Sequence, residues 1–385
     1  MWSLRIILIL VLAHVTIQST NKTRNGRLLS LFNIVQFANE GCTSNSAVSG
    51  GSVSGRLRDG TCFTADECAK KQGQSAGTCA SGFGVCCIFS SMETGSTISQ
   101  NCTYIRNPGF PMPYEATDSI SHTIQKSSSD VCLLRLDFEA FTIQGTGNQF
   151  ETNTLVTPPT TGGVCLDQFT IQLTSGITIP TICGQNSGEH MYLDVGSTGS
   201  STAELSFTFE NIVSNSRQWE IKVIQIPCVS SSRVPQGCLQ FHEGSSGRMI
   251  SFNFLDSADN HLASQDYSIC VRQEAGFCCV EYFPCSDPNS FSLDTSIVGA
   301  SVGGACVKDH IGIEGAMTVC GSGLETNKFC GTALNTAPTL TASGSVCDCS
   351  APFGVRIVTD GAVDVGTVNV LQSRGVCLEY RQRKC

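Results

Sequence analysis

Cysteine is the residue type that most clearly defines the chemistry of this chain. The 385 residues include 23 cysteines. In an exported chain such a density indicates a disulfide framework, and an odd count leaves at least one thiol that is free or bonded to another chain. The closely spaced pairs Cys278-Cys279 and Cys347-Asp-Cys349 do not have the C-x₂-C spacing of zinc sites. We therefore expect disulfides rather than a metal cluster.

Two short motifs could indicate a serine nucleophile, with Ser75 in the segment 73–77 and Ser301 in the segment 299–303. Both fit G-x-S-x-G, a pattern that matters where a strand runs into a helix and the turn exposes the serine. The first lies between close cysteines and the second in a glycine-rich loop. None of the six histidines forms the H-E-x-x-H pattern of metalloproteases. The sequence therefore predicts no catalysis.

The N-terminal residues indicate the compartment. Arg5 precedes a short apolar run over 6–13 that cannot span a bilayer, and Ser19 is a small residue suited to cleavage. We predict a signal peptide over 1–19, a secreted, extracellular protein and no membrane span. The formal charge of −9, without a Lys/Arg cluster, argues against nucleic acid as a partner. Sequons at Asn21 and Asn101 predict surface glycosylation.

The cysteines and the composition divide the chain into three blocks. Only 14% of residues are charged and 38 are glycine, which favours strands and loops over charged helices. We expect a small cysteine-rich module over 26–90, a polar linker over 91–101 and larger domains over 102–228 and 238–385. The middle block alternates apolar and polar residues in the runs 134–138, 169–173, 205–209 and 219–223. This period of two predicts an antiparallel sandwich.

The middle block resembles a CUB domain. The segment Asn101–Tyr114 (NCTYIRNPGFPMPY) resembles the opening of that family, and Cys165-Leu-Asp167 and Ile182-Cys183-Gly184 resemble its C-x-x-D and x-C-G motifs. The third block carries a weaker copy in Cys306-Val-Lys-Asp309 and Phe329-Cys330-Gly331. The resemblance implies two disulfide-bonded CUB jelly rolls, the second divergent, with the bonds Cys102–Cys132, Cys165–Cys183, Cys238–Cys270 and Cys306–Cys330.

Six cysteines that end in an adjacent pair resemble the clip domains of arthropod secreted proteins. That resemblance implies the bonds Cys42–Cys86, Cys62–Cys79 and Cys68–Cys87, although an unrelated stapled knot fits the same residues. The layout of a small knot followed by two CUB modules is itself similar to secreted arthropod proteins. Eight further cysteines of the third block have no predicted partner, and Cys377 could be a buried small hydrophobe in a core strand.

Calcium is the cofactor that the CUB resemblance implies. Many CUB domains hold Ca²⁺ at one edge through a first acid, the Asp of C-x-x-D and a late Asp, all hard oxygen ligands. The middle block retains only Asp167, because Gln144 stands in place of the first acid. In the third block Asp294, Asp309 and Asp360 match all three positions. We therefore expect calcium in the third block only, with turn capping by Asp309 and Asp360 as the alternative.

The expected fold class is all-β: two disulfide-bonded antiparallel β-sandwiches preceded by a small cysteine-rich knot. The expected function is non-enzymatic binding of an extracellular protein or glycan through CUB domains, calcium-dependent through the third block. One alternative is a structural component of cuticle, secretion or venom, built as a disulfide-linked oligomer through the spare cysteine. Another is a non-catalytic regulator of a clip-type protease cascade.

Overall fold

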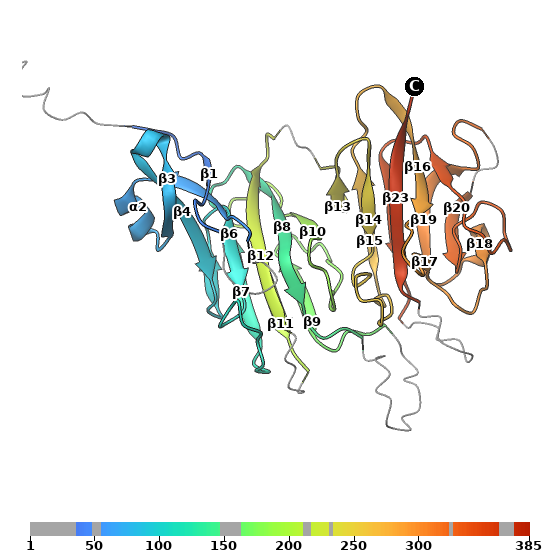
Figure 1. Cartoon of the computed structure of the whole chain (residues 1–385), viewed down its shortest axis with the longest axis horizontal. Coiled ribbons are helices and arrows are strands. Elements are labelled where there is room, and N and C mark those ends of the chain that lie inside the picture. The colour runs from blue at the N-terminus through green and yellow to red at the C-terminus, as the bar shows by residue number, and fades with distance from the viewer. Residues whose placement is uncertain are drawn as a thin grey trace, which may run out of the picture.

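The computed structural model describes residues 36–47, 55–146, 163–210, 217–230, 234–322, 326–361 and 373–385. The predicted signal peptide and Asn21 lie outside the described residues. Strands dominate the rest, which confirms the expected all-β fold class. Three parts follow one another along the chain: an N-terminal module (β1 to β4), a first sandwich (β5 to β12) and a second sandwich (β13 to β23) (Figure 1). Within the described residues, no helix has the length and apolar character that crossing a membrane requires.

The N-terminal module is a small β unit held by three disulfides. Its elements are β1 (Gly41–Thr43), β2 (Asp59–Phe63), α2 (Ala65–Lys70), β3 (Gln74–Cys79), the 3₁₀ turn η1 (Ala80–Gly82) and β4 (Gly84–Ser91). The helix α2 begins after Thr64, whose Oγ1 accepts the Glu67 N–H at 3.2 Å. The structure contains all three bonds that the clip resemblance implies: Cys42–Cys86, Cys62–Cys79 and Cys68–Cys87.

The first sandwich packs two mostly antiparallel layers around an aromatic core. Its strands are β5 (Ser96–Ile98), β6 (Thr103–Arg106), β7 (Ile120–Gln125), β8 (Val131–Thr142), β9 (Gln168–Leu173), β10 (His190–Asp194), β11 (Thr202–Thr208) and β12 (Gln218–Pro227). The alternating runs of the sequence lie in β8, β9, β11 and β12. Their inward residues include Phe207 and Trp219, whose rings stack with centroids 4.2 Å apart.

The predicted linker over 91–101 is wrong in structural terms, because it contains strand β5. Strand β5 pairs in parallel with β7, and β4 of the N-terminal module pairs in parallel with β6. One sheet therefore runs through both parts in the order β1-β2-β4-β6-β12-β8-β10, and the opposite layer is β5-β7-β11-β9. Ile98 is the only apolar, buried residue of β5, so the polar composition of this segment is typical of a linker.

A buried ion network joins the N-terminal module to the first sandwich. Arg58 donates from Nε to Glu220 Oε1 at 3.0 Å and from Nη2 to Oε2, and Arg106 donates to Oε1 at 2.8 Å. The Glu220 side chain is fully buried and that of Arg58 is 4% exposed. Both guanidinium groups also lie over the Tyr104 ring. The N-terminal module is thus fused to the sandwich rather than tethered to it.

The second sandwich is a single curled sheet. It contains β13 (Cys238–His242), β14 (Ser246–Ile250), β15 (Asp266–Val271), β16 (Phe277–Pro284), β17 (Phe291–Ser292), β18 (Ala300–Val302), η2 (Gly303–Ala305), β19 (His310–Met317), β20 (Thr326–Gly331), β21 (Val346–Asp348), β22 (Phe353–Val358) and β23 (Gly375–Lys384). The main path runs β13-β15-β22-β19-β21-β16-β23-β14. The short strand β21 bridges β19 and β16, which closes the curl.

The implied bond Cys102–Cys132 is wrong. Cys132 bonds Cys228, and Cys102 is the free cysteine. Cys102 directly precedes β6, and Cys132 lies on β8. The strand β12 separates β6 from β8, and two strand spacings of about 4.8 Å exceed the Cα distance that a disulfide spans.

The remaining cysteines of the two sandwiches are paired. Cys165–Cys183, Cys238–Cys270 and Cys306–Cys330 are present as the CUB resemblance implies. The cysteines without a predicted partner form Cys278–Cys385, Cys279–Cys349, Cys285–Cys377 and Cys320–Cys347. Cys377 is therefore buried in a disulfide and not as an unpaired hydrophobe.

Candidate functional site

The carboxylate of Asp309 is the centre of the candidate cation site. Asp309 follows the anchored Cys306 and immediately precedes β19, with 2% of its surface exposed. Its Oδ1 accepts the Asp360 N–H at 2.8 Å, and its Oδ2 lies 3.6 Å from His261 Nε2. The pKa of Asp309 is raised to about 6, mainly by burial and also by the charges of Asp360 and Asp294, while His261 and the Asp360 N–H oppose the rise.

The structure brings the three expected acids to one edge of the second sandwich. Asp294 lies two residues after β17 and Asp360 two residues after β22, and both affect Asp309 electrostatically. Asp294 Oδ1 accepts the Ser296 N–H at 2.9 Å. The three carboxylates do not converge within 4.8 Å of one another. Among the described residues, the ligand groups that do converge to this distance are built on disulfide-bonded cysteines: Cys279, Cys320, Cys347 and Cys349, and Cys285, Asp287 and Cys377.

These acids nevertheless fit a hard divalent cation. Their oxygens are the ligands that Ca²⁺ prefers. Burial is the main cause of the raised pKa of Asp309, and the charges of Asp360 and Asp294 act in the same direction. Asp294 Oδ1 is bonded within its own loop, to the N–H and the hydroxyl of Ser296.

The first sandwich closes the equivalent position with an internal cation. Arg217 donates from Nε to Asp167 Oδ2 at 2.7 Å and from Nη2 to Oδ1 at 2.8 Å. The two side chains are 1% and 0% exposed. Asp167 also accepts the N–H groups of Gln144 and Glu210. A bidentate guanidinium therefore compensates this carboxylate, and no metal is needed there.

The two edges correspond position by position. Gln144 and Asp294 lie two residues after β8 and β17, and Glu210 and Asp360 lie two residues after β11 and β22. Arg217 and Arg374 each lie one residue before the last strand of their sandwich. Arg374, however, donates to the carbonyls of Phe254 and Pro288, and its guanidinium lies 4.0 Å from the centroid of the Phe254 ring.

Arg217 and His261 are the site residues that sequence reasoning missed. The sequence did contain a signal for Arg217, because this residue immediately precedes a core strand that lies beside the edge with the acidic positions. His261 had none, since no motif connects it with Asp309, and only the fold brings its Nε2 to that carboxylate and to the Leu293 carbonyl at 3.0 Å.

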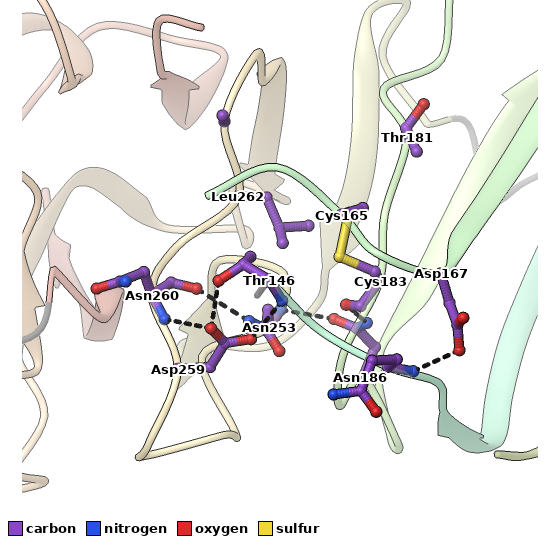
Figure 2. The surroundings of a disulfide bond; sticks show 12 residues. Thr146, Cys165, Asp167, Thr181, Cys183, Asn186, Asn253, Asp259, Asn260 and Leu262 are labelled. Atoms are coloured by element: carbon purple, nitrogen blue, oxygen red, sulfur yellow. Dashed lines mark hydrogen bonds between the residues drawn. A yellow bond between two sulfur atoms is a disulfide. The ribbon is translucent and has the colours of Figure 1, made fainter. Parts of the chain in front are cut away.

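A buried polar interface joins the two sandwiches next to this edge. Asp259 of the second sandwich accepts the Thr146 N–H at 2.8 Å and the Thr146 hydroxyl (Figure 2). Asn253 donates its N–H to Asn186 Oδ1 at 2.7 Å and receives the Gln185 N–H at 3.1 Å. The exposed surface of Asp259 and Asn253 is 1% each. Edge strands β10 and β13 continue the contact, since the Phe241 N–H donates to His190 Nε2 at 3.0 Å.

Cys102 and Asn101 occupy the junction between the N-terminal module and the first sandwich. Burial raises the pKa of the half-buried Cys102 thiol, although the Lys222 ammonium opposes this effect. Asn101 is exposed, and its Oδ1 accepts the N–H groups of Cys102 and Gln225. Glycosylation at Asn101 remains a prediction.

The two G-x-S-x-G serines lie on strands rather than at strand-to-helix turns. Ser75 is on β3 opposite Cys87, and Ser301 is on β18 opposite Cys330. Neither position has the geometry that the nucleophile motif requires.

The comparison with protein families identifies the second sandwich. Residues 235–383 match the animal CUB domain. This match covers the candidate cation site and the strands from β13 to β23, apart from Lys384 at the end of β23. No curated protein sequence matches the chain.

Several solved structures share similarity with parts of the chain. The MASP-1 CUB2 domain bound to Ca²⁺ is 23% identical over 34% of this chain and 98% of its own, with a TM-score of 0.24. The CUB1-EGF-CUB2 domains of rat MASP-1 are 14% identical over 74% of this chain and 99% of their own, with a TM-score of 0.24. The extracellular region of zebrafish Gpr126/Adgrg6 is 10% identical over 76% of this chain and 36% of its own, with a TM-score of 0.25.

Proposed function

We propose that the protein is a secreted, non-enzymatic binding protein whose CUB domain over 235–383 binds Ca²⁺ and uses the metal-bound edge to engage an extracellular protein. CUB domains mediate extracellular protein interactions, and eleven disulfides are typical of that compartment. The first sandwich, whose Gln144, Asp167 and Glu210 occupy the corresponding positions, would be a second CUB-type module.

The observation that supports the cation step is the difference between the two edges. Asp167 is neutralised by Arg217 within the fold, whereas Arg374 is held by Phe254 and Pro288. Asp309 therefore lies near Asp294 and Asp360 with the His261 ring, and not a guanidinium, beside its Oδ2. An external cation would compensate the second edge as Arg217 compensates the first. Ca²⁺ fits because its ligands are oxygens in flexible geometry, and extracellular modules typically bind it with Kd values of about 0.1–1 mM.

The spare thiol supports the binding function more than a cross-linked matrix. Cys102 is half-buried and its pKa is raised, so little reactive thiolate forms at neutral pH. A chain built to link neighbours through this cysteine would instead need an exposed thiol with a lowered pKa.

Calorimetry of the full chain with Ca²⁺ tests the proposal. The wild-type protein should bind one Ca²⁺ with a Kd of about 1 mM or below, and Asp309→Asn should abolish this heat. Asp266→Asn is the matched control, since Asp266 is an exposed acid of the same domain paired with Arg356 at 2.7 Å. Folded wild-type protein that shows no binding at 10-fold higher Ca²⁺, or an Asp309→Asn variant that binds normally, would overturn the proposal.

A further inference from the structure

We propose that the segment Asp259–Gln265 couples cation binding in the second sandwich to the docking of the first sandwich. This inference rests on the proposed calcium function and adds a regulatory consequence. Some residues of the segment contact the first sandwich and others contact the second. It therefore connects a site in one domain with an interface to the other.

One set of contacts from this segment reaches the first sandwich. Asp259 accepts the N–H and hydroxyl of Thr146, and the Ala263 N–H donates to the Gly163 carbonyl at 2.8 Å. Gln265 donates from Nε2 to the Thr181 carbonyl at 3.0 Å. Three of the seven residues thus hold the neighbouring domain directly.

The other set of contacts reaches the candidate cation site. His261 Nε2 lies 3.6 Å from Asp309 Oδ2 and 3.0 Å from the carbonyl of Leu293, the neighbour of Asp294. The Ser264 N–H donates to the Asp360 carbonyl at 2.5 Å. The segment therefore contacts Asp309 and Asp360 directly and reaches Asp294 through its neighbour.

The segment is rigid enough to transmit a shift between these sets. Asp259, Asn260 and His261 are 1–2% exposed. Asn253 donates from Nδ2 to Asp259 Oδ2 and to the Asn260 carbonyl, both at 2.9 Å (Figure 2). Close-packed interiors do not absorb small displacements, so a cation that rearranges Asp309 and its neighbours also biases the position of Asp259.

The interface is packed so tightly that Asp259 could not shift without a change in how the two sandwiches dock. A methyl group on Gly145 would lie 2.1 Å from Asp259 Oδ2, and one on Gly184 would lie 1.7 Å from Asn253 Oδ1. By reciprocity, any change that docking makes in Ca²⁺ affinity equals the change that Ca²⁺ makes in docking. A distortion of the Gly145–Asp259 contact should therefore alter Ca²⁺ affinity in a domain that the substitution does not touch.

The test compares two alanine substitutions in the first sandwich by Ca²⁺ calorimetry on the full chain. Gly145→Ala inserts a methyl group against Asp259, whereas Gly199→Ala places one at 3.5 Å from Ser129 and serves as the control. We expect Gly145→Ala to change Kd about fivefold or more and Gly199→Ala to leave it unchanged. Saturating Ca²⁺ should also change hydrogen exchange at the Ala263 amide, which donates across the interface in the wild-type protein.

The outcomes separate the two proposals. If the wild-type protein binds no Ca²⁺, the proposed function fails and the coupling fails with it. If it binds Ca²⁺ but Gly145→Ala has the wild-type Kd and the Ala263 amide exchanges at the same rate with and without Ca²⁺, only the coupling is overturned. Gln265→Ala, which removes the bond to Thr181, is the second variant if Gly145→Ala does not fold, and it should shift Kd in the same way.

Discussion

Replacing Arg217 by methionine is the most direct test of the internal cation in the first sandwich. The substitution keeps an unbranched apolar stem but leaves the Asp167 carboxylate, with 0% of its side chain exposed, without the two charged hydrogen bonds at 2.7 and 2.8 Å. Removing one partner of a buried ion pair typically costs about 3–5 kcal/mol, because the other charge stays buried and unpaired. We expect this loss in the free energy of unfolding.

The assay is thermal and denaturant unfolding of the full chain. For a unit of this size, about 3 kcal/mol corresponds to a decrease of roughly 10 °C in the midpoint of the affected transition. The double variant Arg217→Met with Asp167→Asn should recover part of the loss, since no buried charge remains. Arg356→Met, which breaks the exposed pair with Asp266, should cost less than about 1 kcal/mol. A loss below 1 kcal/mol in Arg217→Met would refute the internal-cation reasoning.

Three further predictions concern the junctions between the parts. Glu220→Gln should lower the unfolding midpoint and expose the N-terminal module to proteolysis, because it leaves Arg58 and Arg106 without a buried counter-charge; an unchanged digestion pattern would contradict the fusion. One thiol per chain should react slowly with iodoacetamide at pH 7 and faster as pH rises, as burial raises the pKa of Cys102, and Cys102→Ser should abolish the labelling. Burial lowers the pKa of His190 to about 3, so its folded form resists protonation while the unfolded form takes up a proton below about 6.5. Stability is therefore lost as pH falls from 6.5 towards 3, and His190→Asn should lose less stability than wild type over that window in urea titrations; equal losses would refute this assignment.

Much of the fold could be predicted because its signals are local. The alternating runs around Phe138, Phe169, Phe207 and Trp219 mark core strands, since one sheet face is buried and the other is wet. The C-x-x-D and x-C-G motifs are also local signals, and the family resemblance that they carry located Asp309 and the bond Cys306–Cys330. What could not be predicted depends on strand order. Cys102 and Cys132 have the spacing of a disulfide pair, but the intervening β12 places them too far apart.

The disulfides show that the two sandwiches share an arrangement of strands that the spacing of the cysteines in the sequence did not reveal. Cys228 directly follows β12 and Cys385 directly follows β23, and each bonds a cysteine near the start of the neighbouring strand, Cys132 on β8 and Cys278 on β16. Thr123 of β7 takes the place that Cys270 has on β15, because Thr123 pairs with Glu204 and Cys270 with Gly354, each six residues before the acidic position that follows its strand. The first sandwich therefore has no counterpart of the bond Cys238–Cys270.

Because the two sandwiches share this arrangement, their cation edges can be compared directly. Two edges with the same strand positions would carry the same electrostatic problem, a buried carboxylate after the C-x-x-D cysteine. In the first sandwich Arg217 compensates the carboxylate within the fold. That sandwich is also joined to the N-terminal module, and it presents Thr146 at the interface with the second sandwich. In the second, we propose that an exchangeable ion compensates Asp309, beside the segment that holds Thr146. Under this proposal, a domain that Arg217 closes and a cation-dependent domain share one interface, through which Ca²⁺ would set the relative position of the two edges.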